Sequence, residues 1–121
     1  MQFKFISLNL WHGGQLFNKI VNFLSKEKAD ILVLQEACNG KGKFLKRRFR
    51  TVDFLERLLQ YQYYYFSPAF LNIDNIEKIE SGNIIFSKYP IKSANTIFYD
   101  VPYGKFSEKD TEDFSFTPRN L

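Results

Sequence analysis

Hydrophobic and polar residues alternate in two different ways along the first third of this chain, and the difference predicts its first three elements. Apolar residues occupy both odd and even positions over residues 2–9, which is typical of a central strand covered on both faces. Over residues 16–26 they recur at helical spacing, at Leu16, Phe17, Ile20, Val21 and Leu24. A second apolar run at residues 30–35 completes a strand, a helix and a strand.

The remaining chain predicts a second helix followed mainly by strands. Val52, Leu55, Leu58 and Leu59 mark the apolar side of the helix, which Phe54 also joins. An aromatic run at residues 61–66 favours a strand that Pro68 ends, and such a run is more often sheet core than a base-stacking surface. We also expect strands at residues 79–87 and 92–99, a loop at residues 70–78 and a long loop at residues 101–121. This order predicts an α/β fold, with one mixed sheet and helices on one of its faces.

The composition is that of one globular domain. The chain has 121 residues, of which 45% are hydrophobic and 18% aromatic, too many for a disordered segment. No apolar stretch approaches the roughly 20 residues of a membrane span, and no signal-peptide pattern follows Met1. The single cysteine, Cys38, cannot form an internal disulfide, and it lacks the matched histidine and acid of a nucleophile. We therefore expect a cytoplasmic protein in which Cys38 is structural.

Positive charge gathers in one segment. The net charge is +4, from 17 basic and 13 acidic residues, and residues 41–50 contain six basic residues and no acid. Such a segment can neutralise backbone phosphates without reading sequence, so Lys46, Arg47 and Arg48 are candidate substrate-binding residues. The alternative is a solvated loop that leads into the second helix.

Two polar side chains stand where the first two predicted strands end. Asn9 ends the first of these strands, and Glu36 closes the apolar run of the second. A hard cation such as Mg²⁺ takes oxygen ligands and is usually held by one or two carboxylates plus substrate phosphate. Glu36 with Asn9 nearby fits that chemistry. The alternative is that Glu36 is a solvated strand-end residue and Asn9 a turn former.

Three segments of the chain resemble the endonuclease/exonuclease/phosphatase superfamily, in the same order. They are Ile6-Ser7-Leu8-Asn9-Leu10-Trp11, then Ala29-Asp30-Ile31-Leu32-Val33-Leu34-Gln35-Glu36, and a glycine-led strand with a proline turn, Ser81 to Ile91. The resemblance implies a four-layer α/β sandwich and hydrolysis of a phosphate ester, most plausibly a nuclease-type phosphodiester. It implies Glu36 as the ligand of Mg²⁺, or alternatively Mn²⁺, and Asn9 as a catalytic residue that orients the site.

The resemblance covers only the N-terminal half of such a domain. The family's Asp-x-Asn pair and terminal Asp-His pair have no match, because Asp74 and Asn75 are adjacent and His12 lies in the wrong half. The segment 117–121 resembles the arginine-led start of a further strand. We therefore expect residues 1–121 to be a partial domain, truncated at its C-terminal side and inactive alone. Its uncovered sheet face would self-associate or pair with the missing half.

Two other functions remain open at this point. The chain could be a non-catalytic nucleic-acid or phosphate binding module that uses the basic segment, or an inactive scaffold without a site. The substrate also stays open among DNA, RNA, inositol phosphates and lipid head groups. Some DNA-repair members of the family carry an acid where this chain has Trp11, which argues against abasic-site repair.

Overall fold

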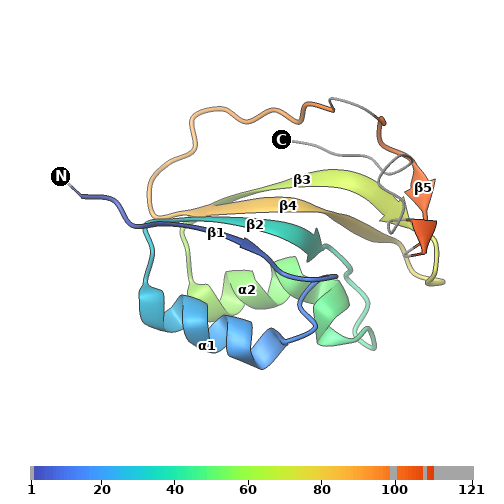
Figure 1. Cartoon of the computed structure of the whole chain (residues 1–121), viewed down its shortest axis with the longest axis horizontal. Helices are drawn as coiled ribbons and strands as arrows, with labels where there is room; N and C mark the ends of the chain where they lie inside the picture. Colours follow the sequence, from blue (N-terminus) through green and yellow to red (C-terminus); the bar gives the residue numbers. More distant parts are fainter. Residues whose placement is uncertain (1, 99–100, 108, 111–121) are drawn as a thin grey trace.

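A single mixed sheet organises the protein, whose computed structural model describes residues 2–98, 101–107 and 109–110. The elements are β1 (Phe5–Asn9), α1 (Phe17–Glu27), β2 (Ile31–Cys38), the short 3-10 helix η1 (Arg47–Arg50), α2 (Thr51–Leu59), β3 (Tyr63–Asn72), β4 (Ile79–Ser87) and β5 (Lys105–Phe106). The strand order in the sheet is β1-β2-β4-β3-β5. Figure 1 shows both α-helices against one face of it. The predicted α/β fold, with one mixed sheet and helices on one face, is confirmed.

The first strand, helix and strand form a parallel unit. β1 pairs with β2 in parallel, from Phe5 opposite Ile31 to Asn9 opposite Gln35. Between them α1 buries Leu24 against the sheet and ends where Lys28 turns left-handed, with its N–H bonded to the Leu24 carbonyl at 3.3 Å. Because the two strands run in the same direction, their C-terminal ends lie side by side at the same end of the sheet.

The hydrophobic core lies between the sheet and the two helices. α2 contributes Val52 and Leu55, which are 2% and 0% exposed. Leu58, predicted on the apolar side of this helix, is instead 52% exposed, because the sheet lies beneath the side of α2 that carries Leu55. The fully buried members of the core are Leu10, Leu24, Ala29, Leu32, Leu34, Ala37, Val52, Leu55, Ile84 and Phe86.

The aromatic strand is longer than the sequence predicts. β3 runs through Pro68 to Asn72, so the prediction that Pro68 ends the strand is wrong, and the following loop covers residues 73–78 rather than 70–78. The pairing of β3 with β4 shifts register between Pro68 and Phe70, and such a bulge accommodates a proline within a sheet. Opposite Pro68 stands Gly82, where a Cβ would lie 2.1 Å from the Ser67 carbonyl oxygen. Only glycine fits where β3 and β4 come this close together.

The second face of the sheet carries a loop instead of the strand predicted at residues 92–99. Residues 92–97 form no strand, and Phe98 makes only an isolated bridge. The segment nevertheless crosses this face (Figure 1), where the Thr96 hydroxyl lies 2.7 Å from the Ser67 hydroxyl and 3.2 Å from that of Tyr65. Side-chain hydrogen bonds therefore hold this segment on the sheet without the backbone pairing of a strand.

Part of the second face remains open. Phe5 of β1 and Ile85 of β4 are 59% and 37% exposed. Strand β5 lies within the predicted long loop and pairs in parallel with the end of β3. The segment 117–121, compared above with the start of a further strand, lies outside the described residues.

Candidate metal and phosphate site

Glu36 occupies an irregular position inside β2. The pairing of β2 with β4 shifts register between Leu34 and Ala37, so Glu36 lies in a bulge and β2 continues to Cys38. Its backbone is left-handed, with φ of 57°, which is uncommon for a residue with a side chain. The prediction that Glu36 closes its strand is thus corrected. The bulge takes Glu36 out of the regular alternation of the strand and allows its carboxylate to reach the loop that follows β1.

The carboxylate and the carbonyl of Glu36 both hold the loop between β1 and α1. Its Oε2 accepts a hydrogen bond from the His12 backbone N–H at 2.7 Å. Its carbonyl oxygen accepts one from the Gly13 N–H, also at 2.7 Å. Two successive amides of the loop are therefore fixed by one residue of the neighbouring strand.

Asn9 holds the same loop from the end of β1. Its Oδ1 accepts a hydrogen bond from the Trp11 N–H at 2.8 Å. The structure therefore brings the two predicted site residues to one turn, Asn9 through Trp11 and Glu36 through His12 and Gly13. An amide and a carboxylate at the ends of adjacent parallel strands supply the oxygen donors that a hard cation takes.

Residues 11–14 form a turn that is left-handed throughout. The φ angles are 60° at Trp11, 46° at His12, 80° at Gly13 and 111° at Gly14. Two successive residues with side chains in this region cost conformational energy, which the bonds to Asn9 and Glu36 offset. Gly13 also meets η1 closely, because a Cβ there would lie 1.9 Å from the Arg48 carbonyl oxygen. We call residues 11–14 the left-handed turn.

The three basic residues predicted to bind substrate point to different places. Arg48 donates a hydrogen bond to the His12 carbonyl at 3.2 Å, and its guanidinium lies 3.9 Å from the centre of the Phe49 ring. Arg47 instead donates to the Asn18 side chain on α1 at 3.0 Å. Lys46 precedes η1 and is exposed. Arg48 thus joins the left-handed turn, whereas Arg47 and Lys46 lie on the surrounding surface.

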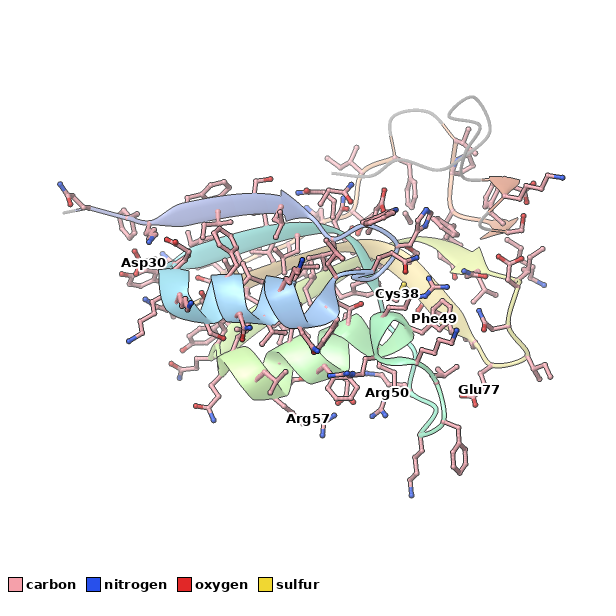
Figure 2. All side chains as sticks on the ribbon, turned by 60° about the horizontal axis from the view of Figure 1, so that its bottom comes forward. Asp30, Cys38, Phe49, Arg50, Arg57 and Glu77 are labelled. Atoms are coloured by element: carbon pink, nitrogen blue, oxygen red, sulfur yellow. The ribbon has the colours of Figure 1, made fainter. Side chains whose placement is uncertain are left out.

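The last residue of the basic segment has an internal partner. Arg50 bonds Asp53 at 2.6 Å, and Arg57 bonds the same carboxylate at 3.0 Å. Figure 2 shows Arg50 and Arg57 at α2, and Cys38 beside Phe49 where β2 approaches η1. Cys38 is buried with Phe49 and Ile79, as its predicted structural role requires.

Sequence reasoning missed two residues that organise this site. Gly13 and Thr51 lie outside the apolar and basic patterns from which the site was predicted. Thr51 is 1% exposed, and its hydroxyl contacts the backbone of Gly13, Cys38 and Arg48. The available signal was the position of Thr51 between the basic run and the apolar helix. A threonine at a helix start often bonds nearby backbone groups through its hydroxyl.

The described residues supply few of the ligands that a metal ion needs. They contain no group of three or more histidine, cysteine, aspartate or glutamate side chains placed to hold a metal ion. Glu36 offers one carboxylate and Asn9 one amide on the same turn, and this donor set fits a magnesium ion that keeps most of its water ligands. No described helix is both long and apolar enough to cross a membrane.

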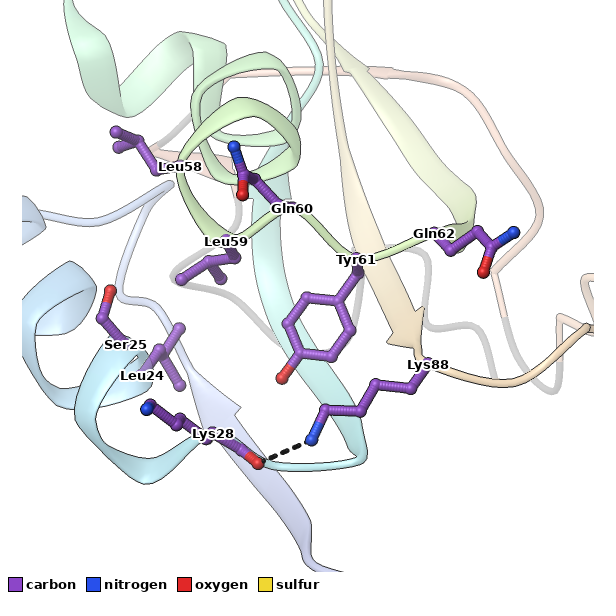
Figure 3. Close-up of a pocket in the computed structure, with 9 residues that line it drawn as sticks. All are labelled: Leu24, Ser25, Lys28, Leu58, Leu59, Gln60, Tyr61, Gln62 and Lys88. Carbon is purple, nitrogen blue, oxygen red and sulfur yellow. Dashed lines mark hydrogen bonds between the residues drawn. The ribbon is translucent and has the colours of Figure 1, made fainter.

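A pocket of about 460 Å³ lies at the opposite end of the sheet. It opens between the C-terminal ends of α1 and α2, next to Lys88, which follows the end of β4 that pairs with the start of β2. Figure 3 shows Lys88 reaching across it to the Lys28 carbonyl, at 3.0 Å. None of the predicted site residues lines this pocket.

Comparison with known proteins identifies relatives of the chain. The sequence model described as "Endonuclease/Exonuclease/phosphatase family" matches residues 6–119. Among solved structures, an endonuclease/exonuclease/phosphatase from Beutenbergia cavernae DSM 12333 is similar with a TM-score of 0.65 and 15% identity, over 98% of this chain and 32% of its own. An endonuclease/exonuclease/phosphatase family protein from Leptotrichia buccalis C-1013-b has a TM-score of 0.55 and 19% identity, over 80% of this chain and 41% of its own. No curated protein matches. The chain thus spans less than half the length of either solved structure.

Proposed function

Because the chain belongs to the endonuclease/exonuclease/phosphatase family, we propose that it carries the metal-binding part of a phosphoester hydrolase, most plausibly a nuclease-type phosphodiesterase. The observation that carries this proposal is the meeting of Asn9 and Glu36 on the left-handed turn. The family as a whole is hydrolytic. The metal, the substrate and the roles of individual residues are our inference.

Glu36 is the metal ligand in this proposal. A bound Mg²⁺, or alternatively Mn²⁺, would supply positive charge that polarises a phosphoryl oxygen and stabilises charge on the leaving oxygen. The bond from His12 N–H to Oε2 orients the carboxylate and restricts its rotation, and the other carboxylate oxygen would bind the metal ion. Asn9 orients the same site by fixing the Trp11 amide.

The basic residues divide into two roles. Arg48 lies beside the left-handed turn, where its guanidinium can contact the phosphate that undergoes reaction. Lys46 and Arg47 lie further out, where they can contact neighbouring phosphates of a nucleic-acid substrate. Substitution of the two outer residues should therefore weaken binding in a salt-dependent way, without changing the metal affinity.

We propose that residues 1–121 act as a partial domain. The described residues hold no group of three or more histidine, cysteine, aspartate or glutamate side chains placed to bind a metal ion, and the matched structures are much longer than this chain. The chain alone should bind metal and turn over phosphodiester very slowly or not at all. A buried thiol at Cys38 agrees with the cytoplasmic location that we propose.

Calorimetric titration with Mg²⁺ tests this function. The wild-type chain is compared with Glu36→Gln and with Glu27→Gln, a matched control whose carboxylate pairs with Lys4 at the other end of the sheet. We expect Glu36→Gln to abolish binding and Glu27→Gln to retain it. Equal binding by all three chains would refute a metal site at Glu36.

A cleavage assay on a phosphodiester substrate, run alongside, separates the remaining functions. Salt-dependent oligonucleotide binding without any effect of Mg²⁺ would indicate a non-catalytic binding module. A chain that binds neither metal nor oligonucleotide would be a scaffold. Rapid cleavage by the wild-type chain would refute the proposal that residues 1–121 are only part of the active domain.

A further inference from the structure

Thr51 joins three segments that carry the candidate site. It is the first residue of α2 and is 1% exposed. Its Oγ1 accepts a hydrogen bond from the Cys38 N–H at 3.2 Å and lies 2.7 Å from the Gly13 carbonyl oxygen and 2.8 Å from that of Arg48. One hydroxyl therefore contacts the end of β2, the left-handed turn and η1.

Each of these segments contributes a group to the site. Cys38 lies two residues after Glu36 on β2. Gly13 donates its N–H to the Glu36 carbonyl, and Arg48 donates to the carbonyl of the preceding residue, His12. The Glu36 carboxylate can be oriented only if the strand and the turn keep a fixed separation, and Thr51 is the buried side chain that bonds both.

We propose that Thr51 is a positioning residue that holds the left-handed turn and Arg48 in register with Glu36, and so sets the metal affinity. This inference rests on the proposed function of Glu36. Thr51 contacts neither metal nor substrate in it. Its effect passes through the backbone of Gly13, Cys38 and Arg48.

A hydroxyl is the group that these contacts require. It can accept from the Cys38 N–H and donate to a carbonyl at the same time, which no apolar side chain of similar shape can do. Valine at position 51 would keep the volume but leave the buried Cys38 amide, the buried Gly13 carbonyl and the partly buried Arg48 carbonyl without this partner. Serine would keep the hydroxyl and remove one methyl group.

Native-state amide exchange, followed by NMR on the 121-residue chain, tests the contact with the Cys38 amide directly. The Gly13 amide, which bonds the Glu36 carbonyl, reports whether the turn keeps its place beside β2. The variants are Thr51→Val, Thr51→Ser and a matched control, Ser67→Ala, which removes another buried hydroxyl that bonds Thr96 away from the site. The strength of one hydrogen bond predicts roughly two- to tenfold faster exchange at Gly13 and Cys38 in Thr51→Val. Thr51→Ser should stay near the wild type, and Ser67→Ala should not accelerate exchange at Gly13 or Cys38 specifically.

Mg²⁺ titration of the same chains tests the consequence for the site. Thr51→Val should weaken Mg²⁺ binding by roughly two- to tenfold, whereas Thr51→Ser and Ser67→Ala should retain it. A uniform acceleration of exchange across the sheet, or Glu36-dependent binding that Thr51→Val leaves unchanged, would overturn the inference alone. Wild-type and Glu36→Gln chains that both fail to bind Mg²⁺ would instead overturn the proposed function and, with it, the effect on affinity.

Discussion

Alanine at position 13 should destabilise the protein far more than alanine at position 14. Both glycines have positive φ, 80° at Gly13 and 111° at Gly14, so alanine at either position costs about 1 kcal/mol in backbone conformation. At Gly13 the new Cβ would also lie 1.9 Å from the Arg48 carbonyl oxygen and 2.9 Å from Cys38 Sγ. At Gly14 its nearest neighbour would be a Phe17 ring carbon at 3.4 Å, an ordinary contact.

The difference between the two variants measures the close approach of the turn to η1. Relief of an overlap with a backbone oxygen costs about 1–3 kcal/mol, as in overpacked cores. We therefore expect Gly13→Ala to lose about 2–4 kcal/mol of unfolding free energy and Gly14→Ala about 1 kcal/mol. Urea denaturation of both variants and the wild type gives these values if the slopes agree. Equal losses would refute the close packing of Gly13 on Arg48.

Three further measurements examine other parts of the structure. Asp30→Asn should lower the melting temperature at pH ~7 but not at pH ~2. The Lys4 N–H and then Lys88 lower the pKa of Asp30 below 3.8. The stability that the Asp30 carboxylate contributes is therefore present above pH 3.8 and is lost as pH falls through the lowered pKa. Burial, then the bond to Glu80, raises the pKa of Tyr103 to about 12, so Tyr103→Phe should remove a step near pH 12 from an alkaline absorbance titration. Stability from this group is complete below pH 10 and is lost as pH rises through 12. Phe5→Ser should reduce self-association in sedimentation velocity, whereas Phe23→Ser, at a residue 45% exposed on α1, should not. A larger reduction by Phe23→Ser than by Phe5→Ser would argue against pairing through the open sheet face.

Local patterns were sufficient to predict the first half of the fold, which brings the two candidate site residues, Asn9 and Glu36, to the same turn. The apolar runs around Asn9 and Glu36 indicate strands, and helical spacing between them indicates a parallel connection. The bulge at Glu36 could not be predicted in this way. It depends on pairing with β4, where Leu34 faces Ile84 and Ala37 faces Gly82, partners more than 40 residues away in sequence.

The wrong predictions share a dependence on tertiary contacts. Pro68 was expected to end its strand, but the bulge opposite Gly82 accommodates it. Residues 92–99 were expected to form a strand, but Thr96 holds that segment through side-chain hydrogen bonds across the sheet face. In each case a contact with a distant segment decides the local structure, and no local pattern reports it.

The basic run shows why adjacency in sequence does not make a binding surface. Lys46, Arg47 and Arg48 were predicted to bind substrate together. Arg47 and Arg48 begin a 3-10 helix, in which successive side chains point roughly 120° apart. Arg47 therefore faces Asn18 on α1 while Arg48 faces the left-handed turn. The charge pattern identifies the segment, but the helix geometry decides which neighbour each arginine contacts.

The open face of the sheet changes from apolar to polar along its strands, and this change bears on how the proposed site at Glu36 could be reached. Near the start of β1 it presents Phe5 beside Ile31, and at the end of β1 it presents Asn9 beside Gln35, whose amide also donates to the Ser7 hydroxyl at 3.1 Å. An apolar partner surface would be stabilised over the first pair and would leave polar groups unsatisfied over the second. A layer that covers this face should therefore stop short of the left-handed turn. Glu36 would then lie at the rim of that contact, where a phosphate ester can approach it from solvent.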